Sequence, residues 1–346
     1  MSLQEQLTEW DNITLAYAGA SRGKRGRRAT AQFEFKLGDN LIELQNELSA
    51  KTFQSGGYHN FLIHEPKQRL ISAAPFCDRV VHHALCNVMV PLLEKRFIQN
   101  SYANRVGKGT HRAISECQRL ARRYKYFLQS DVVQFFPSID HAILRAELQN
   151  ALPDDSLFWL IDKILASGAG VLAGEYDMVY FGSDDLFAVN RPRGLPIGNL
   201  TSQWWANSYL NPFDHFVHRE LRGKAYLRYV DDFVLFANDK QTLWHWREAV
   251  IHRLQKLRLT LHEERAVPRP VTDGVRFLGF VIYPDHRLLK SAKNRSFQHK
   301  MKHLVKAASQ PIIKASLQGW INHVRYGDTW GLRETVLEKF DLLAEA

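Results

Sequence analysis

The chain has 346 residues, of which 45% are hydrophobic, and its 46 lysines and arginines against 36 acidic residues give a net charge of +10. This composition excludes a disordered chain, and the length allows two or three packed subdomains. A chain this basic often binds a polyanion, although a membrane surface or an acidic partner would fit the charge equally well.

The cysteines and the N-terminal residues indicate the compartment. Cys77, Cys86 and Cys117 form no CxxC pair, so we expect buried thiols in a reducing compartment and neither a zinc knuckle nor a disulfide framework. The first residues lack a basic leader followed by an apolar core, and no stretch approaches the length of an apolar membrane span. We therefore expect a cytoplasmic protein that does not bind a membrane.

A basic cluster is the first distinctive feature in chain order. The stretch "SRGKRGRRA" contains Arg22, Lys24, Arg25, Arg27 and Arg28, spaced by glycines. Such a cluster is compatible with a mobile, solvated segment and with an arm that binds phosphate groups. The sequence favours neither interpretation.

Hydrophobic periodicity predicts the elements of the first half of the chain. Leucines at spacings of three and four predict a helix, and mixed aromatic and β-branched residues predict a strand. The expected elements are a helix over 33–53, an extended stretch with turns over 58–79, a helix over 80–97, a strand over 124–137 that closes at Pro137, and a helix over 141–152.

The second half continues this mixture. A glycine- and aspartate-rich stretch over 167–193 predicts a hairpin or a loop insertion. The elements expected after it are a helix over 199–221 capped by Asn199 or Thr201, two strands over 225–239, a helix over 240–259, and a basic helical part that includes 296–327. This order predicts an α+β fold in which helices back an antiparallel sheet.

Two adjacent aspartates lie between the two strands in "AYLRYVDDFVLFAND". A tight turn there would place Asp231 and Asp232 at the tip of a hairpin, where two like charges repel and a divalent cation would stabilise them. Asp131, in "QSDVVQFF", is the best source of a further carboxylate, because a catalytic metal pair needs oxygen ligands from more than one strand. Each motif alone is more often structural than catalytic.

Together the motifs resemble those of reverse transcriptases. "EPKQRLISAAPFCDR", "SYANRVGKGT", "SDVVQFF" and "YVDD" occur in the order of that family, with "GLPIGNLTSQ" before the aspartate pair and "FLGF" after it. The resemblance implies an RNA-directed DNA polymerase of right-hand architecture, with fingers, a palm and a helical thumb. The implied ranges are a basic N-terminal segment (1–30), fingers (31–120), the first part of the palm (121–150), a fingers or palm insertion (151–194), the palm with the hairpin (195–285) and the thumb (286–346).

The resemblance also assigns site residues. Asp131 and Asp231 would be the principal ligands of two Mg²⁺ or Mn²⁺ ions, with Asp232 beside them and the Val132 carbonyl completing one metal site. The residues implied to bind nucleotide are Lys67, Arg69, Phe136, Ile197, Gly198, Gln203 and Arg265, and those implied to bind nucleic acid are Arg105, Lys108, Tyr229, Lys300 and Lys302. Phe136 matches the steric gate against ribose, while Phe135 fits a core phenylalanine better.

Two positions in "LPIGNLTSQ" depart from most reverse transcriptases. Ile197-Gly198 stands where most carry Gln-Gly, and Ser202-Gln203 stands where most carry Ser-Pro. This pattern resembles the enzymes of diversity-generating retroelements, which are bacterial, archaeal or phage-encoded, and it implies error-prone, adenine-directed copying. The implied partners are a template RNA, a DNA or RNA primer, dNTPs and a small basic accessory variability protein.

Two alternatives stay open beside this one. A retron, a group II intron-like or a phage-defence reverse transcriptase would share the aspartates, and a basic RNA-binding protein could carry a catalytically dead polymerase fold. The position of Arg265 is a further departure, since reverse transcriptases usually place near it a lysine that can donate a proton. Arginine is a poor general acid and a good phosphate clamp.

Overall fold

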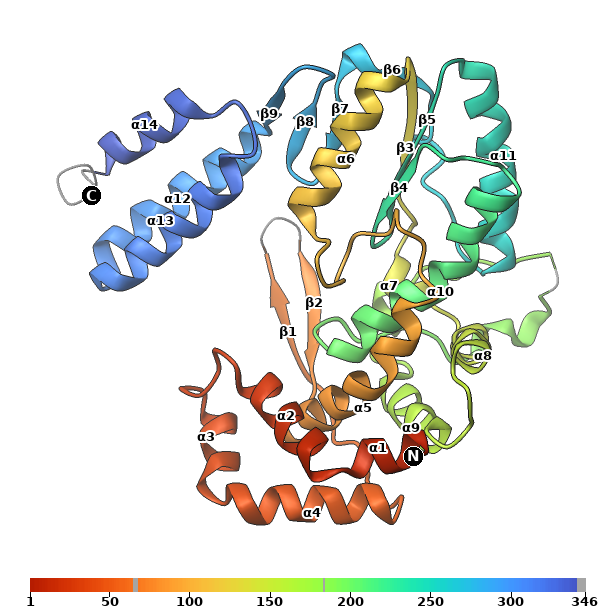
Figure 1. Ribbon diagram of the computed structural model, residues 1–346, viewed down its shortest axis with the longest axis vertical. Coiled ribbons are helices and arrows are strands. Elements are labelled where there is room, and N and C mark those ends of the chain that lie inside the picture. The colour runs from red at the N-terminus through yellow and green to blue at the C-terminus, as the bar shows by residue number, and fades with distance from the viewer. Residues whose placement is uncertain (65–67, 183, 341–346) are drawn as a thin grey trace. The chain divides into compact units, whose positions relative to one another are not determined.

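The computed structural model describes residues 1–64, 68–182 and 184–340 (Figure 1). They fall into two compact units, each assembled from separate stretches of the chain. The first unit comprises Met1–Asn104, Val132–Arg222 and Ala249–His262, and the second comprises Arg105–Asp131, Gly223–Glu248 and Glu263–Ala346. Lys67 lies outside the described residues.

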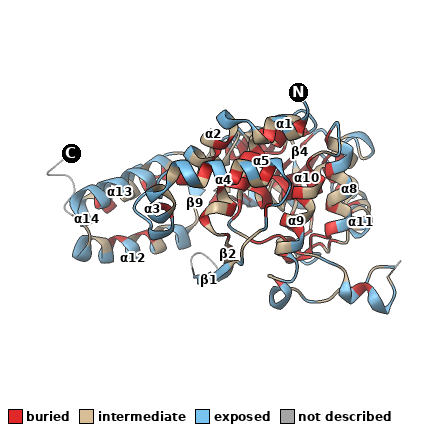
Figure 2. Cartoon of the chain, turned by 90° about the horizontal axis from the view of Figure 1, so that it is seen from below, coloured by how far each residue is buried: buried red, intermediate tan, exposed pale blue. Residues whose placement is uncertain are grey.

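The first unit is mainly helical. Its core lies along α5 and α10, where Trp205, Tyr209 and Phe213 recur at helical spacing and are buried (Figure 2). Its only sheet in the described residues pairs β1 with β2 in antiparallel register. The elements are α1 (Leu3–Thr8), α2 (Trp10–Ser21), α3 (Arg28–Phe35), α4 (Leu37–Ser49), β1 (His59–Ile63), β2 (Arg69–Ala73), α5 (Phe76–Glu94), α7 (Phe135–Ser138), α8 (His141–Ala151), α9 (Phe158–Gly168), η1 (Ala173–Glu175), η2 (Leu186–Asn190) and α10 (Leu200–Arg219).

The second unit contains two antiparallel sheets, with strand orders β4-β5-β3-β6 and β7-β8-β9. The elements before the C-terminal helices are α6 (Thr110–Arg123), β3 (Tyr126–Ser130), β4 (Tyr226–Tyr229), β5 (Asp232–Ala237), β6 (Arg269–Pro270), η3 (Val271–Asp273), β7 (Val275–Phe277), β8 (Phe280–Ile282) and β9 (Arg287–Leu289). Helix α11 (Lys240–Lys256) contributes residues to both units. In β5, Phe233 to Ala237 are all buried, so this strand is covered on both faces, and α6 packs on it and on β4.

The C-terminal part of the second unit is helical, as expected. It consists of α12 (Ser291–Ala307), α13 (Gln310–Val324) and α14 (Trp330–Lys339). The three helices share a small core in which the rings of Phe297 and Trp320 stack with centroids 4.4 Å apart. Among the helices of the described ranges, none is both long enough and apolar enough to span a membrane.

The strand expected over 124–137 was wrong in its second half. β3 ends at Ser130, Val132 makes an isolated bridge to Leu261, and Gln134 adopts a left-handed φ of 44°. Residues Phe135–Ser138 then form a helical turn. The residues after Asp131 therefore leave the sheet, although their apolar pattern is typical of a strand.

Of three other expectations, the structure corrects the first and decides between the alternatives of the other two. The helix over 33–53 is broken at Lys36 into α3 and α4, and Asn199 occupies the N-cap position of α10 without a side-chain capping bond. In 167–193, the described residues form the end of α9 and two 3₁₀ turns without a strand, so this is a loop insertion and not a hairpin.

Candidate active site

The sheet register brings Asp131 and Asp232 to the same place. β3 pairs with β5 in antiparallel register, from Tyr126 opposite Ala237 to Ser130 opposite Phe233. The next positions in that register are Asp131 and Asp232. Asp231 precedes Asp232 in the turn between β4 and β5, so all three predicted catalytic aspartates lie at one end of one sheet.

The hairpin turn that carries the aspartate pair is tight. Tyr229 pairs with Asp232, which leaves Val230 and Asp231 as the two turn residues. Val230 adopts φ 60°, a left-handed conformation that a β-branched residue rarely takes. Such strain costs about 1–3 kcal/mol and is characteristic of functional sites. The sequence predicted the turn but not the strain.

Gln129 holds Asp232 in place. Its side-chain Nε2 donates to Oδ1 of Asp232 at 3.0 Å and to the carbonyl of Arg276 at 3.1 Å. Lys290 donates from Nζ to the same carbonyl at 3.3 Å, and its charge favours an ionised Asp232. Burial nevertheless raises the pKa of Asp232 to about 7; the charges of Asp231 and Asp131 add to the rise, and the Gln129 hydrogen bond opposes it.

Arg265 is paired with Asp131. Its Nη1 donates to both carboxylate oxygens, at 2.8 and 2.9 Å. Both side chains are partly exposed, at 49% for Arg265 and 28% for Asp131. This contact places a permanent positive charge on a proposed metal ligand, which fits a phosphate clamp better than a proton donor.

Arg228 and Thr110 hold the residues next to the aspartate pair. Arg228 is 1% exposed, and its Nη1 donates to the carbonyl of Val230 at 2.7 Å. On the other face of the strand, the hydroxyls of Tyr229 and Thr110 lie 3.0 Å apart and share a hydrogen bond. Sequence reasoning missed Gln129, Arg228 and Lys290, because nothing local distinguishes them from ordinary polar residues of strands and loops.

The oxygen atoms of the three carboxylates are ligands of the type that a hard divalent cation prefers. Mg²⁺ prefers oxygen ligands of this type, and a cation would relieve the repulsion from Asp231 and Asp131 that adds to the effect of burial on the pKa of Asp232. Within the part of the chain that the structure describes, however, no three or more acidic, histidine or cysteine side chains are arranged as a metal site. The Asp131 carboxylate instead contacts the Arg265 guanidinium.

Of the predicted nucleotide-binding residues that the structure describes, all except Arg265 lie in the first unit. Phe136 is half-buried, whereas Phe135 is 3% exposed and belongs to the core. The carbonyl of Phe136 accepts from the backbone of Leu195, which ties it to the segment that carries Ile197 and Gly198. Val132, the proposed carbonyl ligand, is buried.

Strand β2 lies against the same segment. The backbone of Ser72 donates to the carbonyl of Ile197 at 2.9 Å. Gly198 has φ 125°, and a Cβ there would lie 3.2 Å from Ile71, so glycine suits the position both in conformation and in space. Arg69 is exposed at the start of β2, and Gln203 is half-buried in the first turn of α10.

The predicted nucleic-acid contacts differ in exposure. Lys300 and Lys302 are exposed on α12, whose Phe297 and Met301 face the helical core. Arg105 and Lys108 are half-buried and engaged within the protein. The two exposed lysines are available to phosphate groups, whereas the other two residues would have to exchange existing partners.

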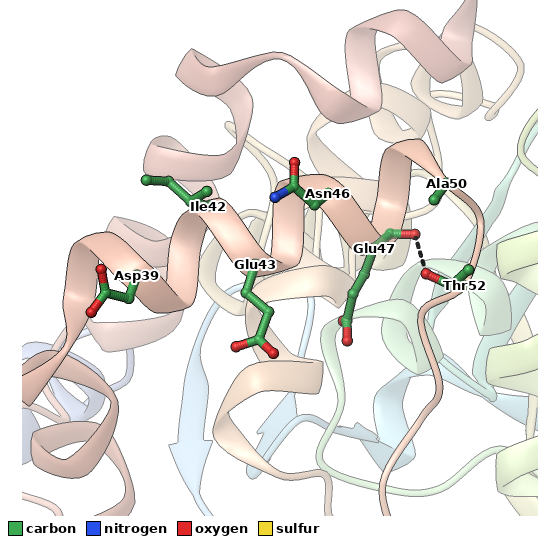
Figure 3. Close-up of a pocket in the computed structure, with 7 residues that line it drawn as sticks. All are labelled: Asp39, Ile42, Glu43, Asn46, Glu47, Ala50 and Thr52. Atoms are coloured by element: carbon green, nitrogen blue, oxygen red, sulfur yellow. Dashed lines mark hydrogen bonds between the residues drawn. The ribbon is translucent and has the colours of Figure 1, made fainter.

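An open hollow of about 480 Å³ along α4 lies outside this site (Figure 3). Asp39, Glu43 and Glu47 line it, and burial followed by the charge of Glu43 raises the pKa of Glu47. Its acidic lining repels nucleotides and nucleic acid, so it is not a substrate site.

A buried antiparallel sheet with three carboxylates at one end defines a right-hand polymerase. Comparison with known proteins then gives the family: the chain belongs to the reverse transcriptase (RNA-dependent DNA polymerase) family, whose sequence profile matches residues 63–282. The fold class and the enzyme class predicted from the sequence, an RNA-directed DNA polymerase, are confirmed. Reverse transcriptases use divalent metal ions.

Curated relatives include bacterial and mitochondrial proteins. Protein YkfC of Escherichia coli (strain K12) is 27% identical over 331 residues, which cover 83% of this chain and 81% of YkfC. Group II intron-encoded protein LtrA of Lactococcus lactis subsp. cremoris is 22% identical over 282 residues, covering 62% of this chain and 44% of LtrA. The chain therefore spans less than half the length of LtrA.

Solved structures show weaker likeness. A partial Cas6-RT-Cas1--Cas2 complex matches with a TM-score of 0.41 and 22% identity, covering 73% of this chain and 42% of that one. Telomerase from Candida albicans matches with a TM-score of 0.44 and 10% identity, covering 74% of this chain and 51% of that one. The family assignment accordingly depends on the sequence profile.

Proposed function

We propose that the protein copies an RNA template into cDNA by nucleotidyl transfer centred on Asp131, Asp231 and Asp232. The observation that carries this proposal is the convergence of Asp131 and Asp232 in one sheet register, with Asp231 in the adjoining turn. Two Mg²⁺ or Mn²⁺ ions bound there, with the Val132 carbonyl, would activate the primer 3′-hydroxyl and neutralise the leaving pyrophosphate. Primer extension on an RNA template, with and without the aspartates, tests the proposal.

The remaining site residues would position the substrates. Lys67 and Arg69 would hold phosphate oxygens, and Arg265 would exchange Asp131 for a phosphate of the nucleotide. Lys300 and Lys302, with Arg105, Lys108 and Tyr229, would contact the primer and template. The sheet of the second unit would be the palm, the β1–β2 hairpin part of the fingers, and α12 to α14 the thumb.

Phe136 is the residue proposed to select the sugar. Phe136→Ala should raise incorporation of rNTP relative to dNTP by on the order of tenfold to a hundredfold, because it opens space beneath the sugar 2′ position. Steady-state incorporation of the two nucleotides on one primed template measures this ratio. Phe135→Ala is the control: it should destabilise the fold by about 3 kcal/mol and leave the ratio unchanged. An unaltered ratio in Phe136→Ala would disprove the gate.

The subtype proposed is that of diversity-generating retroelements, with adenine-directed errors and a small basic accessory protein. The support is the apolar Ile197, half-buried beside Gly198, where a glutamine could hydrogen-bond the nucleotide. Selection by apolar fit is shallow, whereas selection by hydrogen bonds is steep. An isoleucine here should therefore permit misincorporation.

Ile197→Gln should lower the misincorporation frequency opposite template adenine by about tenfold. Sequencing cDNA made from a defined template measures the errors at each base, and Ile197→Val, which stays apolar, is the matched control. Equal error frequencies opposite all four template bases in the unmodified protein would count against the subtype.

A group II intron-like reverse transcriptase is the second candidate. The similarity to LtrA and to Nuclear intron maturase 2 of Arabidopsis thaliana, 25% identical over 145 residues, favours it. This candidate predicts errors spread over all template bases. The same sequencing experiment therefore separates the two candidates.

A further inference from the structure

The basic cluster that follows α2 is an ordered structure. Two successive turns fold it, with the backbone of Lys24 donating to the Ser21 carbonyl and that of Arg27 donating to the Lys24 carbonyl. Gly23 adopts φ 69°, which allows the first turn. The sequence left open a mobile segment and a phosphate-binding arm, and the two turns therefore favour the phosphate-binding arm.

Helix α5 presents further basic side chains to this turn. α5 packs against both α2 and α3 (Figure 1). Arg79 and His83 lie four residues apart on α5, and the His83 ring lies so close to α2 that a Cβ on Gly19 would be 2.7 Å from its Nδ1. Arg79 is half-buried, with its guanidinium carbon 5.5 Å from the centre of the Phe76 ring.

Two of these basic side chains, Lys24 and Arg79, have no acidic partner in the described ranges. Arg25 pairs with Glu34 at 3.6 Å, and Glu34 also accepts from the Tyr17 hydroxyl. No ion pair or hydrogen bond to the Arg79 or Lys24 side chain occurs among the described residues, and Nε of Arg79 is buried without any partner. A guanidinium nitrogen that is buried without a hydrogen-bond partner is costly, and the neighbouring charge of Lys24 is unpaired within the described part of the chain, so the arrangement favours a bound anion.

The electrostatics agree with this geometry. Burial and then the charge of Arg79 lower the pKa of Lys24, and burial lowers the pKa of Arg79. Burial followed by the charge of Lys24 lowers the pKa of His83. Lys24 and His83 are thus each held near another positive charge, and a negative ligand would oppose the part of the lowering that this charge causes.

Aromatic rings adjoin the basic groups. The rings of Phe33 and Phe76 lie 5.1 Å apart, and Tyr17 stacks with Phe33 at 6.2 Å. Tyr17 and Phe33 are half-buried, so each has an exposed part that a base could contact. Basic groups beside aromatic rings are the combination by which proteins bind single-stranded nucleic acid.

We propose that Lys24, Arg79 and His83 form a phosphate-binding site for single-stranded RNA, continued along the surface by the exposed Arg22, Arg27 and Arg28. The site shares no residue with the aspartate centre, and its RNA ligand rests on the proposed function. Arginine would hold a phosphate through its forked donors and lysine as a point charge.

The test is RNA affinity of the full chain, measured by fluorescence anisotropy with a labelled oligouridylate of about 20 nucleotides, without dNTPs or Mg²⁺. The double variant Lys24→Gln with Arg79→Gln should bind about tenfold more weakly, and the slope of log K against log salt should fall by about 1.4, or about 0.7 for each lost contact. Arg79→Lys should recover part of the affinity. Arg25→Gln is the control. It also removes one positive charge from the cluster, but Arg25 is paired with Glu34, so this variant should lose little RNA affinity.

Equal losses of RNA affinity in Arg25→Gln and Lys24→Gln would overturn the site. An unchanged slope of log K against log salt in the double variant would do so too. If Arg79→Gln fails to fold, Lys24→Gln alone still decides, because Lys24 lies in an exposed turn. If the double variant lost binding to vesicles containing phosphatidylserine and kept its RNA affinity, that result would also overturn the proposed RNA site. The assay needs no polymerisation, so an inactive protein that binds RNA in this way would contradict only the proposed function.

Discussion

Asp231→Ala should reduce nucleotide incorporation by on the order of a thousandfold or more, because it removes a carboxylate proposed to hold both catalytic ions. Asp131→Ala and Asp232→Ala should have losses of the same order. All three side chains lie at one end of the β3–β5 pair, where each is proposed to ligate metal. Single-turnover incorporation on a primed RNA template measures the loss.

Asp239→Ala is the matched control for these variants. Asp239 belongs to the same unit, and its carboxylate caps α11 by accepting from the backbone and the hydroxyl of Thr242, at 2.7 and 2.9 Å. Its loss should remove one helix cap, which lowers stability slightly, and leave incorporation nearly unchanged. Comparable losses of incorporation in Asp239→Ala and Asp231→Ala would contradict the assignment of the aspartates.

Arg228→Met should lower the rate of incorporation by on the order of ten- to a hundredfold, since a small displacement of catalytic groups has effects of that size. The buried guanidinium donates to the Val230 carbonyl and so fixes a strained turn that immediately precedes Asp231. We regard Arg228 as a positioning residue. Its loss should lower kcat and leave the KM for dNTP nearly unchanged.

Thermal unfolding separates this effect from a general loss of structure. Arg228→Lys should recover little, because lysine lacks the forked donors of arginine. Arg222→Met, an exposed arginine of the neighbouring loop, is the control and should behave like the unmodified protein. A fall in kcat that only follows the unfolded fraction would refute the positioning role.

The aspartates could be predicted from sequence because strand residues and a tight turn surround them locally. The side chains that contact these aspartates could not be predicted. Gln129 looks like any polar strand residue, and Arg265 reaches Asp131 from a distant part of the chain. The strand through Val132 was overpredicted, because burial beside Leu261 imposes the same apolar pattern as a sheet. Arg79 was missed, since its environment is created by the packing of α5 on two N-terminal helices.

Primer extension on a defined RNA template tests the central claim most directly. The unmodified protein, with dNTPs and Mg²⁺, should extend the primer to the template end, and it should stop when the metal is chelated. Asp231→Ala, folded to the same extent by circular dichroism, should leave the primer unextended. Extension by Asp231→Ala at the rate of the unmodified protein would contradict the account.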